Sequence, residues 1–203
     1  MKLWERLPEH IEIKGHRYRV DLDFRNILRM MEVLGEDNLL PAARDYRALR
    51  CVMRRPPKDA QAVLAAVREI CFPDTGKAPA GPKLTSFSQD ADLIRAAFRQ
   101  AYNIDLWREK LHWVEFSALL AALPEGSRYS EILGIRARPM PKATKYNAEE
   151  RAWLAKAKAQ CAIRLDDKEQ ARAYDEAVRN VFAVLSGIAK AKEGEKEHGV
   201  HGQ

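Results

Sequence analysis

The segment from Phe87 to Leu123 constrains the fold most, because apolar residues recur at helical spacing through most of it. Ser88 is a candidate N-cap for a first helix, and Asp90 and Asp92 then fall near its positive end, where acidic side chains are favoured. Asn103 is placed to end this helix. Its predicted apolar face consists of Ile94, Ala97, Phe98, Ala101 and Tyr102.

A second helix is predicted in the same segment, with Asp105 as its candidate N-cap. It is more apolar than the first, and its apolar residues form two neighbouring lines: Leu111, Val114 and Ala118, then Trp113, Phe116, Leu120 and Leu123. Such a wide apolar surface is typical of a helix buried on more than one side. The spacing allows only a very short connection, which predicts a central antiparallel helical hairpin.

The rest of the chain adds helices and one β-hairpin. Alternating apolar residues between Ile11 and Val20, interrupted by Lys14-Gly15, predict two short strands joined by a tight turn. A helix capped by Asp21 or Asp23 and ended by Gly35 follows, with a predicted buried face of Phe24, Ile27, Leu28, Met31 and Leu34. Further helices are predicted at 42–53, 58–71 and after Gly126. The predicted fold class is therefore mostly α, a multi-helix domain built around the central hairpin with a small N-terminal β-hairpin.

Pro139 and Pro141 interrupt the chain after the helix that follows Gly126, in a stretch that carries Arg136, Arg138, Lys142 and Lys145. Two interpretations stay open for it: a solvated linker, or a basic strap that lies on an acidic partner or on nucleic acid. Asn147 and Glu150 resemble a capping box, which predicts a helix from 148 to about 163. We expect a helical domain over 1–164, a helical extension over 165–190 and a disordered tail over 191–203.

The overall charge admits nucleic acid or an acidic protein as a partner. The formal net charge is +6 and the pI about 9.3. Arg44, Arg47, Arg50, Arg54 and Arg55 cluster around one predicted helix, but Asp45 interrupts them and no nucleic-acid-binding motif is present. A basic nucleic-acid-binding protein is therefore kept as an alternative.

The sequence contains no recognisable catalytic or metal-binding pattern. His112 lies beside Glu115, but no nucleophile elbow and no HExxH sequence occurs. The three cysteines are scattered without metal-ligand spacing. We therefore predict no catalytic residues, no metal site, no cofactor and no enzymatic activity. No apolar run is long enough for a signal peptide or a membrane span, so we expect a cytoplasmic protein without a membrane partner.

Several separated segments together resemble the bacteriophage gp-fifteen family, which is encoded in the tail gene clusters of siphophages and prophages. They are Val20–Arg25, Gln89–Ile94 with Ala97 and Phe98, Tyr102–Leu106, Leu111–Trp113 with Phe116, Leu119 and Leu120, and Ile132–Arg136 with Pro141 and Lys142. The similarity extends over about 11–163. The segment 74–85 and the region after Asp166 lie outside it.

The resemblance implies a role in building a long phage tail within the bacterial host cell. Proteins encoded between the tail tube and tape-measure genes commonly act as tail assembly chaperones for the helical tape-measure protein. The leading prediction is such a chaperone, with the tape-measure protein as partner and possible self-association. The alternative is a structural tail component retained in the virion, which the predicted β-hairpin favours because it can extend a neighbour's sheet.

Binding of a partner requires exposed apolar or aromatic side chains. Two groups of residues are the candidates: Trp107, Trp113 and Phe116 in the central segment, and Tyr174, Val178 and Val181 in the predicted last helix. The same residues would also be suitable for a core.

Overall fold

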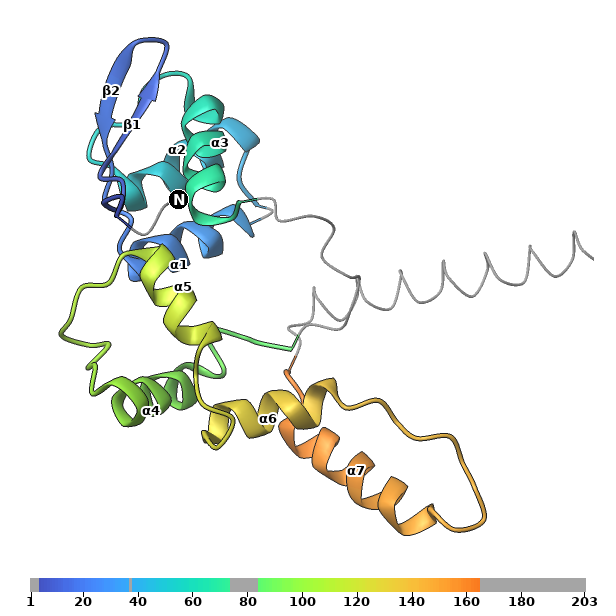
Figure 1. The fold of residues 1–203 in the computed structure, drawn as a ribbon. Coiled ribbons are helices and arrows are strands. Elements are labelled where there is room, and N and C mark those ends of the chain that lie inside the picture. The colour runs from blue at the N-terminus through green and yellow to red at the C-terminus, as the bar shows by residue number, and fades with distance from the viewer. Residues whose placement is uncertain (1–3, 37, 74–83, 165–203) are drawn as a thin grey trace, which may run out of the picture. The chain divides into compact units, whose positions relative to one another are not determined.

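The computed structural model describes residues 4–36, 38–73 and 84–164, and the chain divides into two units after residue 162. The first unit contains all the elements that follow (Figure 1). They are β1 (His10–Ile13), β2 (His16–Arg19), α1 (Phe24–Leu34), α2 (Pro41–Val52), α3 (Ala60–Cys71), α4 (Ala91–Tyr102), α5 (Trp113–Ala121), α6 (Arg128–Ala137) and α7 (Ala148–Cys161). The predicted mostly α fold with an N-terminal β-hairpin is confirmed.

The β-hairpin turns at Lys14 and Gly15, as the sequence predicts. Both residues have positive φ, 52° and 76°, as in the type I′ turn that commonly joins antiparallel strands. Tyr18 pairs with Ile11 and Arg17 with Glu12, so apolar and polar residues face opposite sides. Ile11 is buried against the helical core, and Lys14 forms an ion pair with Asp59 at the start of α3, with 2.7 Å between Nζ and Oδ2.

Helices α1 and α2 pack closely against each other and begin and end at predicted residues. Asp23 caps α1 by accepting a hydrogen bond from the Arg25 N–H, and Gly35 ends the helix. Pro41 occupies the first position of α2. The predicted buried face of α1 needs one correction, because Met30 is buried whereas Met31 is 39% exposed. A helical spacing of three or four residues from Ile27 admits either position.

The central segment differs from its prediction in one respect. Helices α4 and α5 are both present, but residues 103–112 connect them, so the predicted very short turn is wrong. Asp105 does not cap α5. Its carbonyl accepts from the N–H groups of Arg108 and Glu109, which closes a separate turn. His112 is the N-cap of α5, where its Nδ1 accepts from the Val114 N–H at 3.1 Å.

The chain before α5 stays extended because it pairs with the chain before α1. The Phe24 N–H donates to the Leu111 carbonyl at 3.0 Å, and the Trp113 N–H donates to the Leu22 carbonyl at 2.8 Å. These bonds flank a bridge between Asp23 and His112. The sequence shows no local signal for it, since the two partners are far apart in the chain.

Helix α5 lies at the centre of the core, as its wide apolar surface predicts, and contacts α1, α3 and α4. The Phe116 ring stacks on Phe24 and Phe98, with centroids 4.5 and 5.3 Å apart. The buried Trp113 donates from its indole Nε1 to the Cys71 carbonyl at 2.8 Å.

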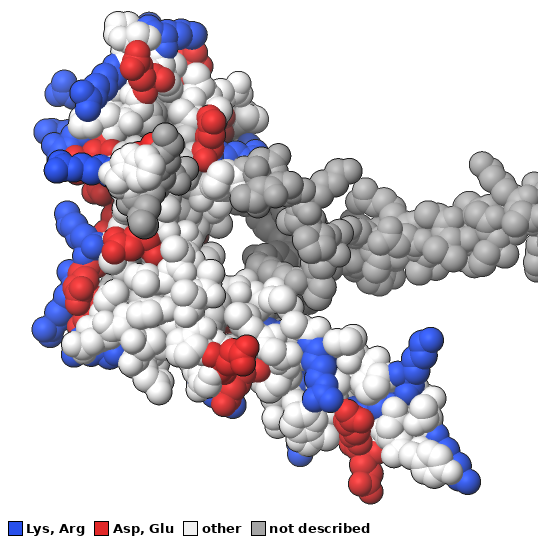
Figure 2. All heavy atoms as spheres, in the orientation of Figure 1, with Lys and Arg blue, Asp and Glu red and all other residues white. Residues whose placement is uncertain are grey.

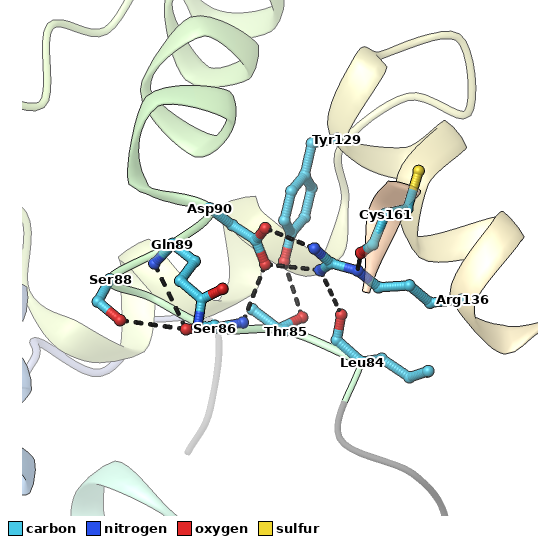
Figure 3. A network of polar contacts seen from close by, with 9 residues as sticks. All are labelled: Leu84, Thr85, Ser86, Ser88, Gln89, Asp90, Tyr129, Arg136 and Cys161. Atoms are coloured by element: carbon cyan, nitrogen blue, oxygen red, sulfur yellow. Dashed lines mark hydrogen bonds and ion pairs between the residues drawn. The ribbon is translucent and has the colours of Figure 1, made fainter. Parts of the chain in front are cut away.

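A buried ion pair between Asp90 and Arg136 joins the start of α4 to α6 (Figure 3). The two guanidinium Nη atoms donate to the two carboxylate oxygens at 2.7 and 2.9 Å, and Nε donates to the Cys161 carbonyl at the end of α7. The Ser86 N–H donates to the same carboxylate. Burial alone raises the pKa of Asp90, but the bonds from Arg136 and Ser86 outweigh it and hold that pKa below its usual value.

This network corrects two predictions. The N-cap of α4 is Asp90 rather than Ser88, and its carboxylate is directed toward Arg136. Arg136 is not part of an exposed basic strap, because its side chain is only 10% exposed.

Of the other basic residues in the predicted strap, Arg138 forms an ion pair with Glu150. Asn147 accepts from the Thr144 N–H instead of completing a capping box with Glu150.

The predicted helical extension 165–190 and tail 191–203 lie outside the described residues, as does most of the segment 74–85. The domain boundaries at 164 and 190 therefore remain predictions.

Candidate protein-binding surface

The structure separates the three candidate residues of the central segment. Trp113 and Phe116 are core residues, with 4% and 1% of their surface exposed. Trp107 is 72% exposed and belongs to the connection between α4 and α5. Tyr174, Val178 and Val181 lie outside the described residues. Of the six candidates, Trp107 is therefore the one that the structure displays on a surface.

The connection that carries Trp107 is held by its own residues at both ends. Asn103 ends α4 in the left-handed conformation, with φ of 56°. Asp105 Oδ1 accepts from the Trp107 N–H at 3.0 Å, and the neighbouring Leu106 is buried in the core. The backbone at Trp107 is therefore held by the hydrogen bond to Asp105 and by the buried side chain of Leu106.

Arg25 at the start of α1 connects this turn to the rest of the domain. Its Nε and Nη2 donate to the two carboxylate oxygens of Asp23, both at 2.8 Å. The same guanidinium reaches the carbonyls of Trp107 and Glu109, at 3.4 and 3.2 Å. Burial tends to raise the pKa of Asp23, but the bonds from Arg25 outweigh burial and lower it.

Sequence reasoning missed this role of Arg25. In the sequence, Arg25 stands out only as the last residue of the segment Val20–Arg25, and no local spacing relates it to Trp107. A bidentate arginine–carboxylate pair, together with bonds to two carbonyls, fixes the direction of the guanidinium plane. Arg25 thereby acts as a positioning residue for the turn that displays Trp107.

The indole of Trp107 lies against α4. The guanidinium carbon of Arg95 is 4.4 Å from the ring centroid, a cation–π distance, and Arg95 also forms an ion pair with Asp92 one helical turn earlier. A shallow depression of about 360 Å³ lies beside the ring. It is lined by Asp92, Arg95, Ala96, Arg99, Ile104, Asp105, Leu106 and Trp107.

We call these eight residues the Trp107 surface. Tryptophan and arginine are the residue types that most often dominate protein–protein binding energies. Here a preorganised indole stands beside the small side chain of Ala96 and within a rim of charged residues, and that composition suits a protein partner better than a polar metabolite. A rigid anchor also loses little conformational entropy when it is covered.

His112, which the sequence places near Glu115 as a possible catalytic neighbour, has a structural role as the N-cap of α5. His112 Nδ1 accepts from the Val114 N–H, which places the ring proton on Nε2. That Nε2 is buried and makes no hydrogen bond of normal geometry within the described residues. The nearby Pro8 carbonyl tends to raise the pKa of His112. Burial has the larger effect and lowers this pKa. The described residues include no cluster of three or more metal-ligating side chains.

The arginines around α2 are partly paired. Arg47 forms an ion pair with Glu36 at 3.0 Å, and Arg44 lies 4.0 Å from Asp45. Arg50 donates to the Arg54 carbonyl. The two ion pairs neutralise part of the basic cluster that motivated the nucleic-acid alternative.

Comparison with known proteins gives one family. The model of the family described as Bacteriophage Gp15 protein matches residues 3–163 of the chain. No curated protein and no solved structure matches the chain. Within the described residues, no helix is both long enough and apolar enough to span a membrane.

Proposed function

The chain belongs to the bacteriophage Gp15 protein family, and from that premise we propose that it is a tail assembly chaperone that binds the tape-measure protein. The proposed activity is binding in the cytoplasm of the host cell and not catalysis. A tape-measure protein is long and helical, so a chaperone for it must cover the apolar faces of amphipathic helices.

The Trp107 surface is the observation that carries this proposal. An amphipathic helix can place an apolar residue in the depression beside Trp107, while its flanking polar residues meet the charged rim formed by Asp92, Arg99 and Asp105. Before binding, Arg25 holds the backbone carbonyl of Trp107 and Arg95 lies over the indole, so a partner gains its contact without first ordering the loop.

The test is co-expression of the full chain with the tape-measure protein of the same phage or prophage. We expect a larger soluble fraction of the tape-measure protein and a complex that survives gel filtration. Trp107→Ala should weaken the complex by about 2 kcal/mol, roughly thirtyfold in Kd, because it removes the central anchor. Trp153→Ala is the matched control, since Trp153 is also exposed, at 58%, but belongs to α7.

Two outcomes have different meanings. If the wild-type chain forms no complex and leaves solubility unchanged, the proposed function is wrong. If the complex forms and Trp107→Ala binds as tightly as Trp153→Ala, the function stands and the Trp107 surface is not the site.

A structural tail component retained in the virion is the second candidate. Its support is strand β2, which has β1 as its one strand partner among the described residues. A free strand edge can join a permanent sheet between neighbouring subunits.

A further inference from the structure

We propose that the outer edge of strand β2 is a binding site for an extended acidic segment of another protein, which adds to the hairpin as a third, antiparallel strand. This site is separate from the Trp107 surface and does not depend on the proposed chaperone function.

The direction of the backbone groups of β2 follows from the register. The Val20 N–H donates to the Glu9 carbonyl, and His16 and Tyr18 lie opposite Ile13 and Ile11. Hydrogen-bonded and non-hydrogen-bonded pairs alternate along an antiparallel ladder. The N–H and carbonyl groups of Arg17 and Arg19 therefore point away from β1, and none of these groups has a hydrogen-bond partner among the described residues.

The helices leave this edge uncovered. Strand β1 is the one that contacts α3, and Figure 1 shows β2 on the side of the hairpin away from that helix. A short stretch of chain already pairs along the same line just beyond the strand: the Asp21 N–H donates to the Val52 carbonyl at 2.7 Å, and Met53 is extended. From Met53 the chain leads to Asp59, which pairs with Lys14 at the turn of the hairpin, and residues 54–58 form no backbone hydrogen bond with β2.

A groove of about 750 Å³ opens where β2 ends. It is lined by Pro8, Glu9, Arg19, Val20, Asp21, Leu22, Asp23, Arg50, Cys51, Val52, Met53, Arg54, Lys110, Leu111 and His112. Its basic residues are Arg19, Arg50, Arg54 and Lys110, which outnumber its acidic residues Glu9, Asp21 and Asp23, and Asp23 is already paired with Arg25. Figure 2 shows basic side chains projecting along the margin of the molecule beside the hairpin. The charge therefore favours an acidic occupant.

The same arginines disfavour a second copy of this chain as the occupant. Antiparallel pairing of two β2 edges would bring arginine side chains together on one face, and like charges that face each other across strands are destabilising. Glutamate at the opposing positions would instead form ion pairs. Because directly opposed residues share a face of the sheet, these glutamates would also be the residues whose N–H groups bond to Arg17 and Arg19.

The test uses the full chain and a peptide in which glutamate alternates with valine. Affinity is measured by fluorescence anisotropy, and amide hydrogen exchange is measured on the protein. We expect binding, slower exchange at the Arg17 and Arg19 amides, and at least about tenfold weaker binding after the double change Arg17→Glu and Arg19→Glu. Arg128→Glu on α6 is the matched control, since Arg128 is also exposed.

Two modified peptides separate strand pairing from attraction by charge alone. Methylation of the glutamate backbone nitrogens removes the N–H groups that bond to β2 and should abolish binding. Methylation of the valine backbone nitrogens changes only the peptide edge that faces away from β2 and should leave most of the binding. Absence of binding, equal binding by the two methylated peptides, or equal binding by a lysine–valine peptide would overturn the proposal. Protection of Arg17 and Arg19 in a dimer without peptide would also overturn it, because the occupant would then be a second copy.

Discussion

At the scale of single residues, His112 is the group whose protonation bears most directly on the fold. It caps α5 through Nδ1 and forms the bridge to Asp23. Burial lowers its pKa below the value of about 6.5 in an unfolded chain, with the Pro8 carbonyl and the charges of Glu115 and Asp21 opposing this in part. The unfolded state therefore binds more protons as the pH falls through 6.5, and the free energy of unfolding decreases.

His112→Asn tests this directly, because asparagine is a good N-cap that does not titrate. We expect the wild-type protein to lose stability relative to this variant as the pH falls from 7 to 5, measured by urea unfolding. The other histidines are common to both proteins, so their contributions cancel in the difference. His112→Ala should cost about 1 kcal/mol at pH 7 through loss of the cap. Parallel pH profiles for the wild type and His112→Asn would contradict the assignment.

Arg25 is the second residue with a specific prediction. Arg25→Lys keeps a positive charge but loses the planar fork that reaches Asp23 and two carbonyls together. We expect this variant to bind the tape-measure protein several-fold more weakly, and amide exchange in residues 107–109 to become faster. Lys14→Arg, a change at an exposed basic residue of the β-hairpin, should alter neither. Unchanged exchange at 107–109 in Arg25→Lys would show that the turn is held without Arg25.

At the scale of elements, the Asp90–Arg136 pair joins α4 to α6 and, through the Cys161 carbonyl, to α7. Asp90→Asn leaves a buried guanidinium without its counter-ion and should cost about 3 to 5 kcal/mol of unfolding free energy. Glu131→Gln breaks the exposed pair with Arg128 and should cost less than about 1 kcal/mol. Similar costs for the two variants would mean that the Asp90–Arg136 pair contributes little.

The pH dependence of the same pair has a defined sign. Because the Asp90 pKa is lowered in the folded state, the pair contributes its stability above the unfolded value of about 3.9 and loses it as the pH falls further. Asp90→Asn should therefore lose less stability than the wild type below about pH 4.

Across the whole molecule, the features that the sequence predicts correctly are those decided by neighbouring residues, such as helix ends and a tight turn. Asp23, Gly35, Pro41 and Asn103 act at helix ends as expected, and Lys14-Gly15 forms the predicted turn. The failures are long-range. Asp105 is as plausible a cap as His112 in sequence, and the choice depends on pairing of residues 111–113 with residues 22–24. Arg136 looks like part of a basic linker until the fold brings it to Asp90.

The candidate site shows the same limit. Trp107, Trp113 and Phe116 are indistinguishable as aromatic residues near one helix, and only the packing around α5 separates two core rings from one exposed ring. Arg25 could not be predicted as a positioning residue, since the carbonyls that it contacts are remote in sequence.

Quantitative mass spectrometry of purified virions beside the assembly lysate, from the phage or prophage that encodes this chain, distinguishes a chaperone from a structural tail protein. A tail assembly chaperone is displaced when tube subunits assemble. We therefore predict that the protein is abundant in the lysate and absent from the finished particle. A stoichiometric amount in the particle would contradict the chaperone role and identify a structural tail protein instead.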